Sequence, residues 1–338
     1  MKISLRSINI CDRIQRMKKY SFKSKNVSKK NAEFIDRLNP ELKLHAAKKL
    51  ILREAILYGQ KICPELILEE YRVTAEHSGL NTSDVYNWMI MDSTTLKFEK
   101  ELTFAYQKEI SRTKRALYAA TFQNHEGEMS LFRYKNNEYN FTAIGESLFS
   151  LRCGVNEKGL FAARHRIYSG SEEAGITPGM VIRLLLQRCS SADSAISFLK
   201  SIPHSTCSSY FIGHKNNMFI VETVPKLVKI IAPEKYFLTL ANHFLSEELV
   251  NLDIKNSLFP QNNSIRRDSH AAFFLMKNRH KLDIELAKTI LNNREGDISS
   301  AEGDFTTRYA MIYEENSRSF LLAEDSKGKR KYKKIKIG

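Results

Sequence analysis

The sequence has few cysteines, and they are not arranged as a disulfide framework. It contains five in 338 residues, an odd number at scattered positions: Cys11, Cys63, Cys153, Cys189 and Cys207. Disulfide-rich secreted proteins usually carry an even number at short spacings, so this usage indicates a reducing compartment, and we expect a cytoplasmic location. No Cys-x-x-Cys pair or Cys/His cluster has the spacing of metal ligands, and no cofactor is expected.

A long apolar run is absent as well. No stretch approaches the roughly 20 residues that cross a bilayer as a helix. Residues 1–30 are basic but contain neither a continuous apolar segment nor a small-residue cleavage site, so we expect no secretory signal. With 42% hydrophobic and 10% aromatic residues, the composition is that of a globular protein, long enough for one large core or two ordinary ones.

Positive charge is abundant. The net charge is +15, and basic residues concentrate at 18–30 and 327–336. Such a balance attracts polyanions, among them nucleic acid, anionic membranes, acidic proteins and phosphate-bearing molecules. The charge is not accompanied by an aromatic-interleaved RNA motif or a helix-turn-helix signature, so nucleic acid is not expected as a partner. A solvated basic surface is the simpler interpretation.

Helical and strand-like patterns alternate in blocks along the chain. Apolar residues at helical spacing predict helices over 40–59, 64–76 and onward from 81, and later over 178–189, 191–199, 268–276 and 283–291. Runs of β-favouring residues predict strands at 101–106, 116–122, within 131–151, and at 161–167, 208–212, 218–223, 227–231, 236–240, 306–313 and 319–323. The charge run at 327–336 shows no core pattern.

Five short motifs, in a fixed order, supply the most specific signal. The segment 154–160 reads G-x-N-E-x-G-L, which predicts a tight turn in which Asn156 tolerates left-handed backbone. The other four are a helical segment at 63–92, N-x-[DE] at 124–126, N-H-F at 242–244 and S-x-x-R at 264–267.

Together these motifs resemble the linear-amide N-terminal-nucleophile (Ntn) hydrolases, in particular the peptidase family of the acyl-CoA:6-aminopenicillanate acyltransferases. The resemblance covers about residues 64–323. It implies an α+β fold, the αββα Ntn-hydrolase sandwich with two antiparallel sheets between helical layers. We therefore expect a basic extension at 1–39, an Ntn-hydrolase-like acyltransferase domain at 40–325 and a basic tail at 326–338.

The sequence departs from this family at the nucleophile. Relatives read G-C-T where residues 101–103 read Glu-Leu-Thr, so Leu102 stands at the position of the cysteine. An Ntn enzyme uses the side chain of its first residue as the nucleophile and the freed α-amino group as the base. Leucine supplies no attacking atom, so Thr103 becomes the candidate nucleophile, after cleavage of the peptide bond that precedes it.

The resemblance also implies roles at other positions. Glu126 stands for the aspartate that orients the nucleophile's amine, and Asn242 for the amide that binds the oxyanion. The expected catalytic residues are therefore Thr103, Glu126 and Asn242. Gln123 replaces an arginine, and the expected substrate-binding residues are Gln123, Asn124, Asn156 and Arg267. For both Asn156 and Asn242 the alternative is a structural role in a turn or loop.

Three hypotheses for function remain open. The first is a diverged acyltransferase or amidohydrolase that still works through Thr103. The second is a pseudoenzyme that binds an acyl-amide or acyl-thioester ligand, with coenzyme A or an acidic carrier protein as candidate partners. The third is polyanion binding through the basic ends. A Cys153–His125 pair on another catalytic plan has weaker support, because nothing in the sequence brings the two together.

Overall fold

The computed structural model describes residues 18–21, 72, 100–123, 129–135, 138–147, 149–167, 173, 175–253, 263–299, 307–326 and 329–337. The helices predicted at 40–59, 64–76 and onward from 81 lie outside these residues, apart from Arg72, which is helical.

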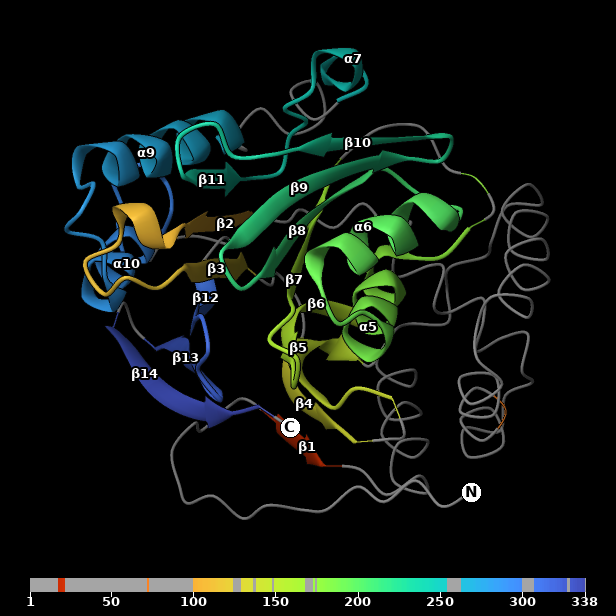
Figure 1. Ribbon diagram of the computed structural model, residues 1–338, viewed down its shortest axis with the longest axis horizontal. Helices are drawn as coiled ribbons and strands as arrows, with labels where there is room; N and C mark the ends of the chain where they lie inside the picture. Colours follow the sequence, from red (N-terminus) through yellow and green to blue (C-terminus); the bar gives the residue numbers. More distant parts are fainter. Residues whose placement is uncertain are drawn as a thin grey trace.

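Two sheets form the body of the protein (Figure 1). The larger has eight strands in the order β1-β4-β5-β6-β7-β8-β9-β10. Their bounds are β1 Lys18–Ser21, β4 Ser130–Tyr134, β5 Phe141–Ser147, β6 Ser150–Asn156, β7 Phe161–Arg166, β8 Ser208–His214, β9 Asn217–Val224 and β10 Leu227–Ile231. All its neighbouring strands are antiparallel except β1 and β4, which are parallel.

The smaller sheet has six strands in the order β11-β2-β3-β12-β13-β14, and all its neighbours are antiparallel. Their bounds are β11 Phe237–Leu240, β2 Glu101–Tyr106, β3 Leu117–Gln123, β12 Thr307–Glu314, β13 Ser319–Ser326 and β14 Lys329–Lys336. β2 is an interior strand, paired on one side with β3 and on the other with β11.

Helices cover the outer faces of both sheets. Figure 1 shows α5 (Pro178–Arg188) and α6 (Ala192–Ser201) on one side of the sandwich, and α9 (Ser264–Lys277) and α10 (Ile284–Leu291) on the other. α5 packs on β6 and β7, whereas α9 packs on β11 and β2. The predicted αββα sandwich with two antiparallel sheets is therefore confirmed. Among the described residues, helices long and apolar enough to cross a membrane are absent.

Sequence patterns explain where these helices begin and end. Pro178 occupies the first turn of α5, where a missing amide hydrogen costs nothing. Ser191 caps α6 in a reciprocal capping box with Ser194. α9 begins at Ser264, four residues before the predicted start. Two short helical turns, η1 (Lys108–Ile110) and α7 (Glu247–Val250), complete the described elements.

Strand alternation sorts the core into three layers. On β2, Leu102, Phe104 and Tyr106 belong to the cluster beneath α9 and α10. Ala105, on the opposite face of the same strand, belongs to the cluster between the sheets. A third cluster lies between the eight-stranded sheet and helices α5 and α6. Because successive side chains point to opposite faces of a strand, odd-numbered residues of β2 face the other sheet.

The expectation that the charge run at 327–336 lacks a core pattern is wrong for most of its length. Lys329–Lys336 forms β14, which pairs with the whole of β13 at the edge of the six-stranded sheet. Ile335 packs into the core between the sheets and is 7% exposed. Lysines protect an edge strand from pairing with other chains, so a basic composition suits this position and hides the strand signal.

Ile335→Ala should destabilise the fold by about 2–4 kcal/mol, because it removes a buried aliphatic side chain. Lys334→Ala, at an exposed position on the same strand, should change the free energy of unfolding by no more than about 0.5 kcal/mol. Urea unfolding of both variants measures the difference. Equal, small effects would show that β14 contributes nothing to the core.

Candidate functional site

The Glu101 carboxylate is the centre of a buried polar cluster at the start of β2. It is 0% exposed and accepts hydrogen bonds from three segments of the chain. Arg152 Nη1 donates to Oε1 at 3.1 Å, Asn242 Nδ2 donates to Oε2 at 3.1 Å, and the backbone N of Arg166 donates to Oε2 at 3.4 Å. The Glu101 backbone N also donates to Asn242 Oδ1 at 2.8 Å. Both sheets and the loop after β11 therefore meet at this one side chain.

A β-bulge brings Arg152 into the cluster. The pairing of β5 with β6 shifts between Ile144, which is opposite Cys153, and Gly145, which is opposite Leu151, so that Arg152 lies at the bulge. Cys153 lies in the core between the sheets, and Arg152 reaches Glu101 on that same side. Neighbouring residues of a regular strand would face opposite ways, so the bulge gives both side chains one direction. Glu146 holds the same guanidinium through Nε at 2.9 Å and Nη2 at 2.5 Å.

Arg267 supports Asn242 from the helical layer. Its Nη2 donates to Asn242 Oδ1 at 3.2 Å, and its Nη1 lies 3.5 Å from Asp297 Oδ2. Lys100 Nζ lies 3.3 Å from the same carboxylate oxygen. Burial lowers the pKa of the Arg267 guanidinium to about 10, while Asp297 and Glu101 oppose that decrease. Arg267 is therefore cationic at neutral pH, and the asparagine amide is held from two sides.

A second buried polar pair adjoins the cluster on β2. Thr103 Oγ1 lies 2.7 Å from His165 Nε2, and both residues are 0% exposed. His165 lies on β7, two residues after Ala163, whose side chain lies in the core between the sheets. Sequence reasoning did not select His165. Alternation along the strand predicted at 161–167 was the available signal, since it places His165 on the face toward β2.

Asn156 is the last residue of β6, and its side chain contacts the end of α5 rather than the Glu101 cluster. Its Nδ2 donates to the carbonyl oxygens of Leu186 at 3.0 Å and Cys189 at 2.8 Å, at the end of α5. Its Oδ1 accepts from the backbone N of Lys158 and of Leu160. The amide thus ties the tight turn to the helix layer with all four bonds inside the chain.

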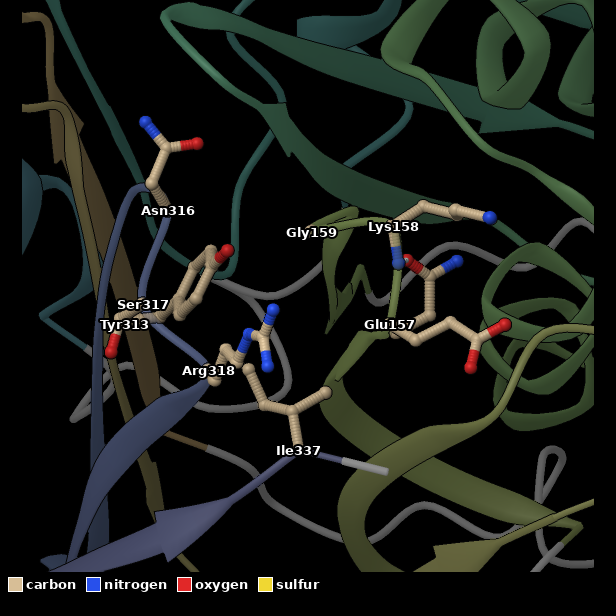
Figure 2. Close-up of a pocket in the computed structure, with 9 residues that line it drawn as sticks. Glu157, Lys158, Gly159, Tyr313, Asn316, Ser317, Arg318 and Ile337 are labelled. Carbon is tan, nitrogen blue, oxygen red and sulfur yellow. Dashed lines mark hydrogen bonds between the residues drawn. The ribbon is translucent and has the colours of Figure 1, made fainter.

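A cavity of about 410 Å³ lies next to this turn. In Figure 2, Glu157 and Lys158 of the turn lie across from Tyr313 and Arg318, which come from the β12–β13 side. Asn156 is four residues beyond Arg152 along the strand, or about 13 Å at the rise of extended chain. The cavity and the Glu101 cluster therefore lie at opposite ends of β6.

Comparison with known proteins decides the family. The family model described as acyl-coenzyme A:6-aminopenicillanic acid acyl-transferase matches residues 115–328, more than half of the chain. The chain belongs to this acyl-transferase family. No curated protein matches its sequence.

One solved structure supports the fold. Penicillin V acylase from Agrobacterium tumefaciens is similar with a TM-score of 0.52 and 14% sequence identity, over 70% of this chain and 86% of that chain. A variant of the conjugated bile acid hydrolase from Clostridium perfringens gives a TM-score of 0.48 and 14% identity, over 70% and 97% of the two chains. At 14% identity, the likeness to penicillin V acylase supports the sandwich fold and nothing finer.

The two faces of β2 separate Leu102 from its neighbours Glu101 and Thr103. Leu102, expected at the position of the cysteine, packs beneath α9 and α10. Glu101 and Thr103 face the other sheet, where they meet Asn242 and His165. The amide of Asn242, which the resemblance assigns to the oxyanion, therefore contacts Glu101. Glu101 is one position before Leu102, the residue aligned with the family's cysteine.

The predicted site residues divide into four groups. Thr103, Asn242 and Arg267 lie in or beside the cluster, as described above. Gln123 ends β3 with its backbone paired to Thr307. Asn124 and Glu126 lie outside the described residues, so their roles stay predictions, as does the substrate contact assigned to Gln123. The contacts of Asn156 support its architectural role and give no support to substrate binding.

Asn156→Ala should destabilise the protein by about 2–4 kcal/mol, because two buried carbonyls lose their donor and the turn loses its acceptor. Asn140→Ala is the matched control, since Asn140 Nδ2 makes one exposed bond, 2.7 Å long, to the neighbouring Glu157; its cost should stay below about 1 kcal/mol. Urea unfolding checks both. A loss of ligand affinity without any loss of stability in Asn156→Ala would contradict the architectural role.

Proposed function

We propose that this chain is an acyl-transferase family member that has lost the family reaction at its Ntn centre and binds an acyl-amide or acyl-thioester ligand without converting it. The observation that carries this proposal is the Glu101 carboxylate on the amide of Asn242. In a working centre that amide would be available to the oxyanion of the substrate, a contribution of roughly 3–4 kcal/mol to catalysis. Here the chain's own side chain takes its place.

The continuity of β2 supports the same proposal. An Ntn nucleophile needs a free α-amino group, which requires cleavage of the peptide bond before it. The bond between Leu102 and Thr103 lies inside β2, where both residues are in register with β3 and Thr103 also pairs with Leu240 of β11. A peptide group held in a ladder has little freedom to adopt the strained geometry of an acyl shift.

A working enzyme is the second candidate, and one observation favours it. The 2.7 Å contact between Thr103 Oγ1 and His165 Nε2 has the geometry of a hydroxyl nucleophile with an imidazole base. Both groups are fully buried, so a substrate would reach them only after the sheets separate locally. We therefore rank this candidate second.

The proposed partners follow from charge. A net charge of +15 favours ligands with phosphate groups, such as coenzyme A thioesters, or an acidic carrier protein. Lys158 and Arg318 bring cationic side chains to the rim of the cavity beside the β6–β7 turn. The described cysteines, Cys153, Cys189 and Cys207, are free and buried, which supports a cytoplasmic setting. Polyanion binding along the lysine-rich edge strand β14 is the alternative.

Intact-mass analysis tests the loss of reaction. After prolonged incubation with acyl-thioesters and acyl-amides, we expect one species of 39.0 kDa without an acyl adduct. A chain that begins at Thr103, or an adduct that disappears in both Thr103→Ala and His165→Ala, would establish the second candidate instead.

Ligand binding is read separately by thermal shift. Acyl-thioesters or an acidic carrier protein should raise the Tm of the wild-type protein, because a ligand that binds only the native state stabilises it. Absence of any shift across acyl-thioesters, acyl-amides and carrier proteins would remove the binding half of the proposal.

A pair of cysteine variants tests which position faces the site. Glu101→Cys places a thiol beside the Asn242 amide, whereas Leu102→Cys places one beneath α9 and α10. Both positions are 0% exposed, so p-nitrophenyl acetate reaches either thiol only through local opening of the structure. We expect it to acylate the thiol at position 101 about tenfold faster or more, since only there can an amide donor stabilise the oxyanion. Peptide mapping separates these adducts from the native cysteines, and the wild-type protein gives the background. Faster acylation at position 102 would show that residue 102, aligned with the family's cysteine, is the one that faces the site.

A further inference from the structure

The donors around Glu101 have the character of a binding site that the chain itself fills. Three donors from three segments converge on the two carboxylate oxygens: Arg152 Nη1, Asn242 Nδ2 and the backbone N of Arg166. We propose that Glu101 is a built-in ligand of a carboxylate-binding site, and that a free carboxylate binds there when the side chain is removed. The inference rests on the proposed function, because a working centre would need these donors for its substrate.

The donors do not depend on the Glu101 side chain for their position. Glu146 holds Arg152 through Nε and Nη2. Arg267 and the backbone N of Glu101 both donate to Asn242 Oδ1, which fixes the direction of the amide nitrogen. The backbone N–H at position 101 persists in any substitution except proline. Asn242 Nδ2 is also held by its bond to the carbonyl oxygen of Arg166 at 3.2 Å. Truncating the Glu101 side chain therefore opens a space beside donors that their other contacts keep in position, which is the arrangement that favours ligand binding.

Charge in the cluster also favours an anion. One chain of contacts joins the carboxylates of Glu101, Glu146 and Asp297 to the cations of Arg152, Arg267 and Lys100. Removing the Glu101 charge leaves a buried cation without its full compensation, an unfavourable state that a bound anion relieves. A neutral ligand would not compensate the charge of the buried cation, so it should not be stabilised in this way.

The size of the missing fragment selects the ligand. Glu101→Ala removes one methylene and the carboxylate, which is the structure of acetate less one hydrogen. Formate fills the space less completely, and butyrate is too long for a side-chain cavity enclosed on all sides, since Glu101 is 0% exposed. Overpacking a closed cavity is unfavourable, so affinity should peak at acetate.

Thermal unfolding of the full chain with sodium acetate, at constant ionic strength set by sodium chloride, tests the proposal. Glu101→Ala should melt below the wild type, and 100 mM acetate should raise its Tm by about 3–6 °C more than chloride does. Formate should act more weakly and butyrate not at all. The wild type, in which the Glu101 side chain already fills the site, should respond to acetate no more than to chloride.

A second variant separates charge from space. Glu101→Gln keeps the volume of the side chain and lacks its charge, so acetate should not stabilise it, because the site remains filled. If Glu101→Ala does not fold in chloride, Glu101→Ser is melted in acetate and in chloride instead. The yield of refolded Glu101→Ala in acetate and in chloride then gives a second comparison of the two anions. Acetate-specific stabilisation or refolding confined to the truncated variants supports the proposal, and an equal response in acetate and chloride overturns it. Neither result depends on turnover, which the intact-mass experiment on the wild type reads separately.

Discussion

The ion pair between Glu101 in the six-stranded sheet and Arg152 in the eight-stranded sheet fixes how the two sheets meet at one end of the sandwich. Its atoms are 3.1 Å apart, and neither side chain is more than 4% exposed. A buried ion pair stabilises a fold only when further hydrogen bonds satisfy both partners. Glu146 does this for the guanidinium, and Asn242 does it for the carboxylate. The hydrogen bonds from Glu146 and Asn242 therefore offset the cost of burying the two charges.

The resemblance to Ntn enzymes implies a different use for the Asn242 amide, as a donor to the oxyanion. Donors that are fixed in advance and shielded from water suit an oxyanion, because they need no reorganisation during the reaction. In this chain those properties serve a permanent carboxylate. Under the proposed function, the Glu101 carboxylate occupies the amide of Asn242 that a substrate oxyanion would otherwise use.

Several features were predictable from local patterns. Most of the strands and helices after residue 100 and the turn at 154–160 follow from periodicity and turn residues. The strand β14 was missed because its lysines, which suit an exposed edge, mask the single buried Ile335. The lysine-rich composition of this segment indicates a solvated tail, whereas its pairing with β13 makes it a strand.

The sequence by itself determined the fold class, the order of the elements and the absence of a thiol at positions 101–103. Only the tertiary structure decided which side chains meet. A bulge turns Arg152 toward Glu101, and alternation on paired strands sets His165 against Thr103 and Leu102 against the helices. A one-residue change of register reverses the face of every side chain on a strand, and register is fixed by contacts with distant parts of the chain. Local sequence does not contain that information.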